Sequence, residues 1–190
     1  AVAESQAVRL SEVGGVLATI AVSLVLIQSV IAVLILPTFI ASDAYERWWE
    51  AVAHAFYYAA SAFTNTGFAP NPEGIAVFGD DAWFLAVGTF VGALRFPVIF
   101  ALVRWVRTRQ RLGVHVRLTL ITTTVLLVVG GALIWLLEHD NPATIGGEAP
   151  AFGVFTSGFV SVMTRSGGFS NVDIAAMNDS TLVVMDLLMF

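Results

Sequence analysis

The chain has 190 residues, of which 57% are hydrophobic and 12% are charged, and its net charge is −5. Soluble domains carry charge on about a quarter of their residues, so this composition indicates a membrane protein and argues against nucleic-acid binding. Cysteine and lysine are both absent, which excludes thiolate catalysis, disulfides and a Walker A phosphate loop from this chain. With no H-E-x-x-H or G-x-S-x-G motif either, we expect neither an enzyme nor a bound cofactor.

Uncharged apolar runs mark the membrane spans. Residues 13–42 are long enough to cross a hydrocarbon core of about 30 Å with some tilt, and residues 118–137 cross once more. A run at 82–103, interrupted only by Arg95, is predicted to be a further span. The apolar segment 181–190 stops before it could cross and the chain begins without Met, so we expect part of a longer protein, cut inside a helix.

Two further apolar segments are too short to span. Residues 51–64 and 149–164 would form helices of roughly 21 to 24 Å, which must enter the membrane and turn back. Each runs into a similar loop, SAFTNTGF at 61–68 and SVMTRSGGF at 161–169. Irregular backbone at membrane depth is tolerated only where protein or a water-filled pathway surrounds it, so these loops should present their carbonyls to a desolvated cation.

The charged residues predict the orientation in the membrane. Five arginines crowd the connection between the run 82–103 and the next span, which places this connection on the cytoplasmic side: Arg104, Arg107, Arg109, Arg111 and Arg117. The same arginines could instead contact anionic lipid headgroups or a cytoplasmic partner. The opposite ends of the spans carry acidic residues, including Glu138. This acidic face either raises the local cation concentration at a pore mouth or is an ordinary solvated surface.

The order of elements predicts two parallel repeats. Residues 1–108 contain a span, a re-entrant helix, a glycine loop at 64–68 and a second span, and residues 109–190 restart the pattern with a loop at 164–169. Two spans per unit preserve the orientation, so both loops enter from the outside. The negative C-terminal end of each short helix points at its loop, which favours a cation there.

Four motifs resemble one protein family. Thr64-Asn-Thr-Gly-Phe68 resembles the T-N-A-G-F loop, and Met163-Thr-Arg-Ser-Gly-Gly-Phe169 the T-T-R-T-A-G-F loop, of the potassium-translocating membrane subunits of the Trk/Ktr/HKT superfamily. Val91-Gly-Ala-Leu-Arg-Phe-Pro-Val98 resembles the G-G-L-G-F-P-V stretch of that family, and Leu187-Leu-Met-Phe190 the start of its L-M-F-I-G-G segment. The resemblance implies an all-α membrane protein with potassium-channel-like, parallel M1-P-M2 repeats and re-entrant pore helices, of which the second and third of four lie here.

The resemblance also assigns the site. It implies that backbone carbonyls just before each filter glycine face the ion, at Asn65, Thr66 and Gly67 in one strand and at Ser166, Gly167 and Gly168 in the other. The filter-flanking residues are Thr64, Phe68, Thr164, Arg165 and Phe169. Gly67 and Gly168 can adopt positive φ, and Phe68 and Phe169 are expected to wedge the strands against neighbouring helices. Potassium is the expected ion, with sodium left open, and channel-like flux is not distinguished from ion-coupled transport.

Three charged residues and one histidine have alternative interpretations. Arg165 either braces its strand by pairing with an acid or with helix carbonyls, or repels cations. Arg95 either extends its charge to the cytoplasm or lines the inner pore as an electrostatic barrier. Asp186 either pairs with a residue elsewhere or lines the pore, and His54 is either a packing residue or a ligand or pH sensor.

Function and partners follow from the resemblance. It implies potassium uptake through a channel-like pore in the plasma (inner) membrane, by a multi-pass homodimer that contacts the lipid bilayer and a cytosolic nucleotide-binding regulatory subunit of the RCK, TrkA or KtrA type. The alternatives are a secondary-active solute carrier whose broken helices bind substrate at the membrane midplane, and a membrane subunit with no transport role. Parallel repeats with bare glycine loops favour the pore over the carrier.

Overall fold

The computed structural model describes residues 4–41, 45, 47–71, 74–75, 83–109, 111–147 and 149–190. Every regular element in this part of the chain is helical, which confirms the all-α fold. The α-helices are α1 (Glu4–Ala41), α2 (Trp48–Phe63), α3 (Trp83–Ala93), α4 (Arg95–Thr108), α5 (Val114–Glu138), α6 (Pro150–Val162) and α7 (Asp179–Met189). A π-helix, Met163–Gly167, extends α6, and a short 3-10 helix, Ile174–Ala176, precedes α7.

Within the described residues, two continuous helices are long and apolar enough to cross a membrane. They are Leu17–Ala41 within α1 and Val114–Glu138, each of 25 residues and therefore about 38 Å long. Their outward side chains are apolar, with Leu26 60% and Val128 65% exposed, as expected where the surroundings are hydrocarbon rather than water. The span predicted at 13–42 is a continuous helix as far as Ala41, the last described residue there, and the span predicted at 118–137 lies within α5.

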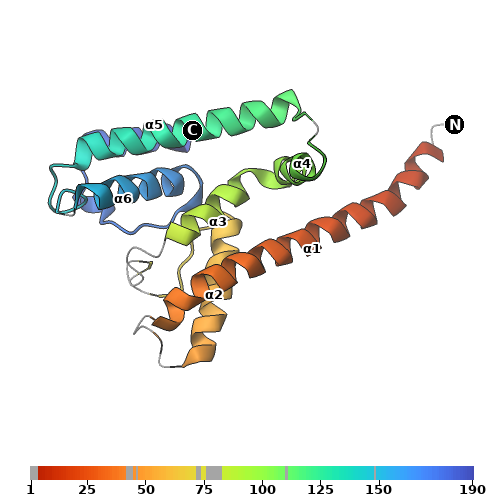
Figure 1. Ribbon diagram of the computed structural model, residues 1–190, viewed down its shortest axis with the longest axis horizontal. Coiled ribbons are helices and arrows are strands. Elements are labelled where there is room, and N and C mark those ends of the chain that lie inside the picture. The colour runs from red at the N-terminus through yellow and green to blue at the C-terminus, as the bar shows by residue number, and fades with distance from the viewer. Residues whose placement is uncertain are drawn as a thin grey trace.

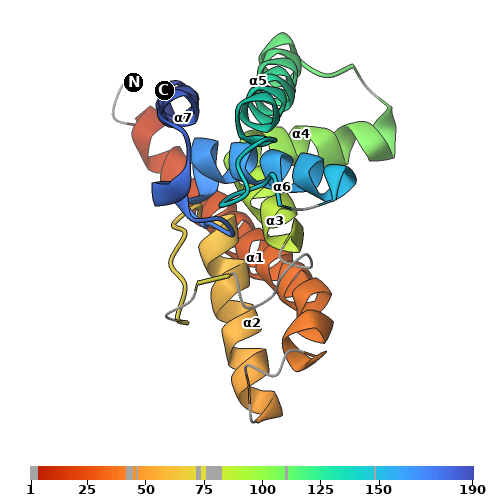
Figure 2. The ribbon, with the colours of Figure 1, turned by 90° about the vertical axis from the view of Figure 1, so that its left-hand side faces the viewer.

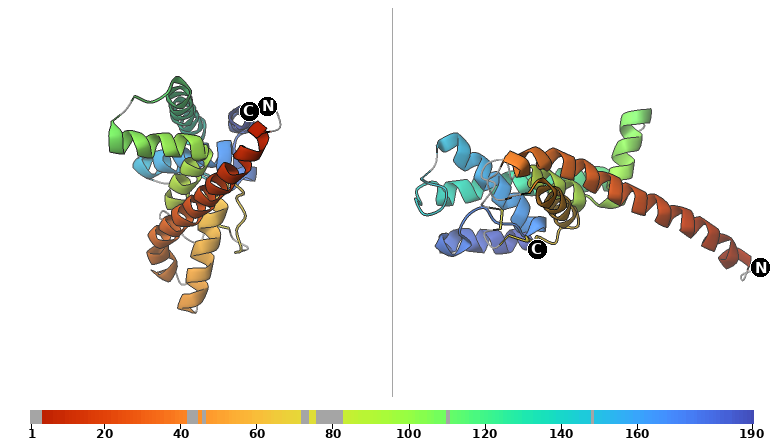
Figure 3. Two further views of the ribbon diagram at one scale, coloured as in Figure 1. Left: turned by 90° about the vertical axis from the view of Figure 1, so that its right-hand side faces the viewer. Right: turned by 90° about the horizontal axis from the view of Figure 1, so that it is seen from below.

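The third predicted span, 82–103, is broken into two helices. The axes of α3 and α4 are bent by 97° around Leu94, and α4 stands at a steep angle to α1 (Figure 3). Pro97 has no amide hydrogen and is tolerated only in the first turn of a helix, which is its position in α4. The Leu94 N–H is shared between the Phe90 and Val91 carbonyls at 3.3 Å each, so the helical hydrogen bonds weaken at the break. The run 82–103 is therefore a bent helix pair, and it is a span only if α3 and α4 cross the membrane together.

The helices pack around two cores. In the first, α1, α2 and α3 surround Phe39 and Tyr58, and Phe159 of α6 and Phe169 reach this core from the second half of the chain. In the second, α5, α6 and α7 surround Ile134. Figures 1 and 2 show α3 lying between α2 and α6, which makes it the helix that joins the two halves.

The helices that precede the two glycine loops are α2 and α6. They have 16 and 13 residues, so α2 extends about 24 Å and α6 about 20 Å. Both are shorter than a hydrocarbon core of about 30 Å. Each leads into one of the two glycine loops, and these lengths match the re-entrant helices expected from the sequence.

Glu138 ends α5 as a fully buried side chain and not as part of an acidic surface. It is 0% exposed, and its two carboxylate oxygens accept four hydrogen bonds. The donors are Asn141 Nδ2 at 2.8 Å, Thr144 Oγ1 at 2.7 Å, Asn178 N at 2.8 Å and Thr181 Oγ1 at 2.5 Å. The expectation that Glu138 belongs to an exposed acidic rim was therefore wrong, because its carboxylate joins α5 to the start of α7.

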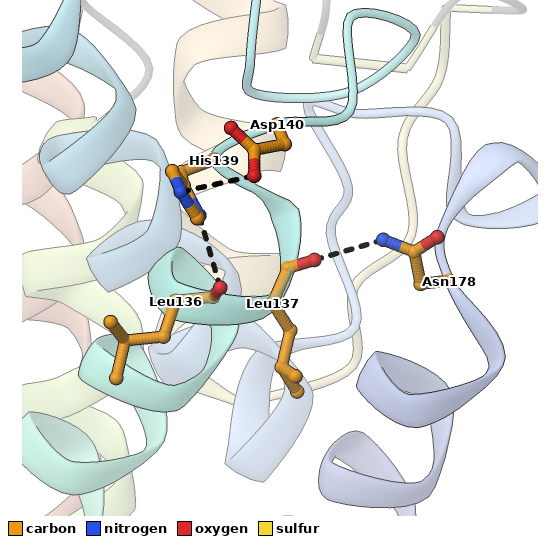
Figure 4. Close-up of polar contacts among 5 residues, drawn as sticks. All are labelled: Leu136, Leu137, His139, Asp140 and Asn178. Carbon is orange, nitrogen blue, oxygen red and sulfur yellow. Dashed lines mark hydrogen bonds and ion pairs between the residues drawn. The ribbon is translucent and has the colours of Figure 1, made fainter.

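The same junction has a second set of contacts at its surface (Figure 4). The Asn178 side-chain amide donates to the Leu137 carbonyl at 2.8 Å, so α7 begins against the last turn of α5. The ring of His139 lies 3.0 Å from the Leu136 carbonyl and 3.2 Å from the Asp140 carboxylate. The carboxylate of Asp140 is 90% exposed, so this ion pair contributes little compared with the buried contacts of Glu138.

Replacing Glu138 tests the buried junction. Glu138→Ala removes the acceptor of four buried or half-buried hydrogen bonds, although Asn141 Nδ2 and Thr144 Oγ1 each keep a second acceptor, and it should destabilise the full-length protein by on the order of 3 kcal/mol. The measurement is the midpoint of thermal unfolding in detergent. Asp140→Asn, next to the junction but exposed, is the matched control and should leave the midpoint within about 1 °C. Equal effects of the two substitutions would contradict the assignment.

Candidate functional site

The first loop, 64–68, follows α2, and its threonine hydroxyls form hydrogen bonds with the last turn of that helix. The Thr64 N–H and hydroxyl both donate to the Ala60 carbonyl, at 2.9 and 2.7 Å. The Thr66 N–H donates to the Ser61 carbonyl at 3.0 Å, and the Thr66 and Ser61 hydroxyls lie 3.1 Å apart. Asn65 and Gly67 then adopt φ values of 57° and 71°, so the chain turns sharply out of the helix. The backbone amides and hydroxyls of the loop thus donate hydrogen bonds to the last carbonyls of α2.

The second loop, 164–169, leaves its helix differently. α6 widens into the π-helix Met163–Gly167, and the Gly168 N–H donates to the Met163 carbonyl at 2.9 Å. Gly168 has a φ of 77° and ends this wide turn. Single π-turns within α-helices are frequent at functional sites. The two loops are similar in sequence, but they reach their turns through different backbone geometry.

The two loops meet at their glycines. A Cβ atom added to Gly67 would overlap the carbonyl oxygen of Gly167 and lie 2.8 Å from Cα of Gly168. A Cβ atom added to Gly168 would lie 3.5 Å from Cα of Gly67 and 3.7 Å from the Thr66 carbonyl oxygen. Residues a hundred positions apart are thus in backbone contact, which only glycine allows at this distance.

α3 supports both loops through small residues. A Cβ atom on Gly92 would overlap the carbonyl oxygen of Phe63, so α3 touches the last turn of α2 directly. On the same helix, Thr89 lies against Gly167, and its hydroxyl is 3.8 Å from the Met163 sulfur. Gly88 and Gly92 form a G-x-x-x-G pattern, a signal of close helix packing in membranes that the sequence analysis did not use.

Two cavities lie against the loops. One, of about 610 Å³, is lined by Asn65, Arg165 and Ser166 together with residues of α3, α4, α5 and the end of α7. The other, of about 420 Å³, is lined by the same three residues together with Met163 and Gly168. The two cavities therefore share Asn65, Arg165 and Ser166, which lie in the two loops next to the glycine contact. The first cavity is lined by polar and apolar groups alike and the second mainly by apolar ones, and no group of three or more His, Asp or Glu side chains that could hold a metal ion occurs in the described residues.

The expected flanking residues differ in their surroundings. Phe169 is 5% exposed, and its ring centroid lies 5.9 Å from that of Tyr58, whereas Phe68 is 68% exposed. The Tyr58 hydroxyl donates to the Gly74 carbonyl at 3.0 Å and so fixes the segment that returns from the first loop. Thr164 is half-buried beside Arg165 in the second loop.

The charged and titratable candidates have few partners. Within the described residues, neither Arg165 nor Asp186 has an ion-pair or hydrogen-bond partner, although Arg165 lines both cavities. The His54 ring packs 5.0 Å from the Tyr45 ring, and its Nδ1 is buried without a partner in this part of the structure. The side chain of Arg95 lies outside the described residues, so both of its interpretations stay predictions.

Comparison with known proteins places the chain among transporters. A family model described as "TrkH: Cation transport protein" matches residues 3–190. The chain is 34% identical over 146 residues to "Ktr system potassium uptake protein B" of Vibrio alginolyticus, and this alignment covers 75% of the chain and 32% of that protein. It is 30% identical over 146 residues to the protein of the same name in Bacillus subtilis, with 75% of the chain and 33% of that protein covered. It is 24% identical to "Potassium/sodium uptake protein NtpJ" of Enterococcus hirae, with 75% of this chain and 32% of that protein covered. The chain thus spans about a third of the length of these curated relatives.

A methyl group at Gly92 tests whether the α2–α3 contact supports the site. Gly92→Ala forces α3 away from the Phe63 carbonyl and should destabilise the full-length protein by about 1–3 kcal/mol, measured by thermal unfolding. Gly14→Ala in α1 is the control, because no atom lies within 4 Å of its added Cβ. The control should be neutral or slightly stabilising, since alanine is the better helix former. If Gly92→Ala behaves like the control, the close approach of the two helices is incorrect.

Proposed function

The chain belongs to the TrkH family of cation transport proteins, and we propose that it contributes two filter strands, 64–68 and 164–169, to a pore for potassium uptake. The observation that carries this proposal is the backbone contact of Gly67 with Gly167 and Gly168, in two loops whose residues Asn65, Arg165 and Ser166 line two cavities. In this proposal the carbonyls of Asn65, Thr66, Gly67, Ser166, Gly167 and Gly168 replace the hydration shell of the ion. The units 1–108 and 109–190 are the repeats that carry one strand each.

Electrostatics and backbone chemistry support a cation at this place. The last carbonyls of α2 and of α6 with its π-turn point along their helix axes toward the loops, so both short helices present the negative ends of their dipoles. Non-helical backbone is tolerated at membrane depth only where protein or water surrounds it, and α3 and the two cavities supply those surroundings. Backbone carbonyls at such a site coordinate monovalent cations without any titratable group.

Potassium is the proposed main ion, and sodium is the proposed second one. The Vibrio alginolyticus and Bacillus subtilis relatives are named for potassium, and the Enterococcus hirae relative is named for potassium and sodium. Ion preference in a carbonyl filter depends on the number and field strength of the coordinating dipoles. Two strands of different geometry supply a less regular ring than identical strands would, so we propose moderate discrimination between the two ions.

Filter substitutions in the full-length protein test the function. Gly67→Ser and Gly168→Ser should each lower the preference for potassium over sodium by about tenfold, because a side chain at positive φ distorts the carbonyls. The measurement is rubidium and sodium uptake by cells that lack their own potassium uptake systems. Gly113→Ser, with φ −59° and no atom within 4 Å of an added Cβ, is the control. Unchanged ion preference in well-expressed filter variants would favour the carrier alternative, for which the broken α3–α4 pair is the supporting observation.

The proposed partners follow from the naming of the relatives and from the exposed arginines. "Ktr system" names a multi-component assembly, which fits a cytosolic nucleotide-binding regulatory subunit, and we propose a homodimer of the full-length protein above it. The arginines of the α4–α5 connection are all exposed and are the proposed contact with that subunit: Arg104, Arg107, Arg109, Arg111 and Arg117. This orientation puts the connection in the cytoplasm of a cell whose plasma (inner) membrane holds the protein, with both filter loops open to the outside.

Single cysteines test the orientation, since this chain has none of its own. Arg109→Cys between α4 and α5 should react with a membrane-impermeant maleimide only after the cells are permeabilised. Ala143→Cys, exposed between α5 and α6, should react in intact cells. The two positions lie at opposite ends of α5 and act as controls for each other. Labelling in the reverse pattern would invert the proposed topology.

A further inference from the structure

We propose that the side-chain amide of Asn65 positions the two loops relative to each other and to α3, and thereby sets the ion preference of the site. This inference rests on the proposed function, because it concerns the same pore. From the sequence alone, Asn65 was expected to act only through its backbone carbonyl. The new assignment concerns the side chain, whose amide positions the loops and does not itself bind the ion, while the backbone carbonyl of Asn65 keeps its proposed role in the filter.

Asn65 occupies a conformation that suits this role. Its φ of 57° is left-handed, and among the described non-glycine residues only Arg109 shares a positive value. Asparagine is among the few residues that adopt this conformation readily. The Asn65 N–H still donates to the Ala62 carbonyl at 3.2 Å, so the backbone stays attached to the end of α2 while the chain turns toward α3.

All four hydrogen-bonding positions of the amide are used. With its nitrogen directed at two carbonyls, the group donates to Ala62 O at 3.1 Å and to Thr89 O at 3.0 Å. Its oxygen then accepts from Ala93 N at 3.2 Å and from Ser166 Oγ at 3.3 Å. The opposite orientation would set oxygen against carbonyl oxygens and nitrogen against an amide hydrogen, so the neighbours fix the orientation. No lone pair is left over for a cation.

The four partners come from three separate segments. Ala62 belongs to α2, Thr89 and Ala93 belong to α3, and Ser166 belongs to the second loop. The Thr89 carbonyl and the Ala93 amide are one turn apart, and in an ideal helix they would bond each other. The Asn65 amide thus contacts the hydrogen-bond ladder of α3 immediately before the 97° bend, and side chains that insert into such a ladder are a known cause of kinks.

This geometry links the loops to each other twice. Asn65 bonds Ser166 directly, and the same turn of α3 that it holds also carries Thr89, which lies against Gly167. Ion preference in a carbonyl filter depends on how many carbonyls face the ion and on how they are arranged around it. Because the amide spans both strands and their common support, its loss should change the spacing and hence the ratio of potassium to sodium uptake.

Two substitutions separate the amide from the backbone conformation. Asn65→Gly keeps the positive φ and removes the amide, and Asn65→Asp keeps the shape but turns two donors toward carbonyl oxygens into acceptors. In full-length protein, each substitution should lower the preference for rubidium over sodium by about fivefold, the scale of one lost hydrogen bond. The preference is measured as the KM for sodium divided by the KM for rubidium, and this quotient is called the KM ratio. Asn71→Ala is the matched control, because the Asn71 amide donates to the Tyr45 hydroxyl at 3.1 Å outside the filter loops, and it should leave the ratio unchanged.

A double substitution tests the link to the second loop. Ser166→Ala should change the KM ratio in the same direction but less, and adding it to Asn65→Gly should cause no further change, because the two groups share one hydrogen bond. Should Asn65→Gly fail to accumulate in the membrane, Ser166→Ala, which leaves every backbone angle untouched, decides alone. An unchanged ratio in Ser166→Ala would then overturn the proposal.

The outcomes also distinguish this inference from its premise. If Asn65→Gly and Asn65→Asp leave the KM ratio unchanged while Gly67→Ser lowers it, the positioning role is overturned and the filter stands. If Gly67→Ser also leaves the ratio unchanged, the filter assignment fails and the role of Asn65 fails with it. A fall in the ratio for both Asn65 variants, with Asn71→Ala neutral, supports the proposal.

Discussion

The structure depends on the close approach of three backbones, those of the two loops and of α3. Gly67 touches Gly167 and Gly168, and Gly92 touches the Phe63 carbonyl, at separations that no side chain would allow. Where helices and loops pack this closely, van der Waals contact replaces the hydrophobic effect, which contributes little between apolar surfaces within a membrane. The relative positions of α2, α3 and α6 all follow from these contacts, since α3 is the helix shared by the two halves of the chain.

Close approach creates a second requirement, because irregular backbone removed from water must still satisfy its hydrogen bonds. The first loop meets it with short polar side chains: the Thr64 and Thr66 hydroxyls bond the end of α2, and the Asn65 amide bonds α3 and the second loop. The second loop meets it with a π-turn closed by Gly168. Both solutions satisfy amide hydrogens locally, which leaves loop carbonyls available for another partner.

The sequence predicted those features of the structure that depend only on neighbouring residues, namely the long helices and the turns at glycine. The length of the uncharged runs predicted α1 and α5, and the positive φ of Gly67 and Gly168 agrees with the expected use of glycine. The break at Leu94 was missed because the run around it is uniformly apolar apart from Arg95, although Pro97 was a readable signal. The burial of Glu138 and the contacts of the Asn65 amide depend on donors up to a hundred residues away, so no short pattern encodes them.

The difference between the two loops also bears on how such a site can evolve. One strand turns through a left-handed asparagine and the other through a π-turn, and both are encoded in one polypeptide. In an assembly of identical subunits, a single codon change alters every copy of a strand at once. Here a codon change alters one loop and leaves the other as it was, so the proposed filter is open to adjustment in small, separate increments.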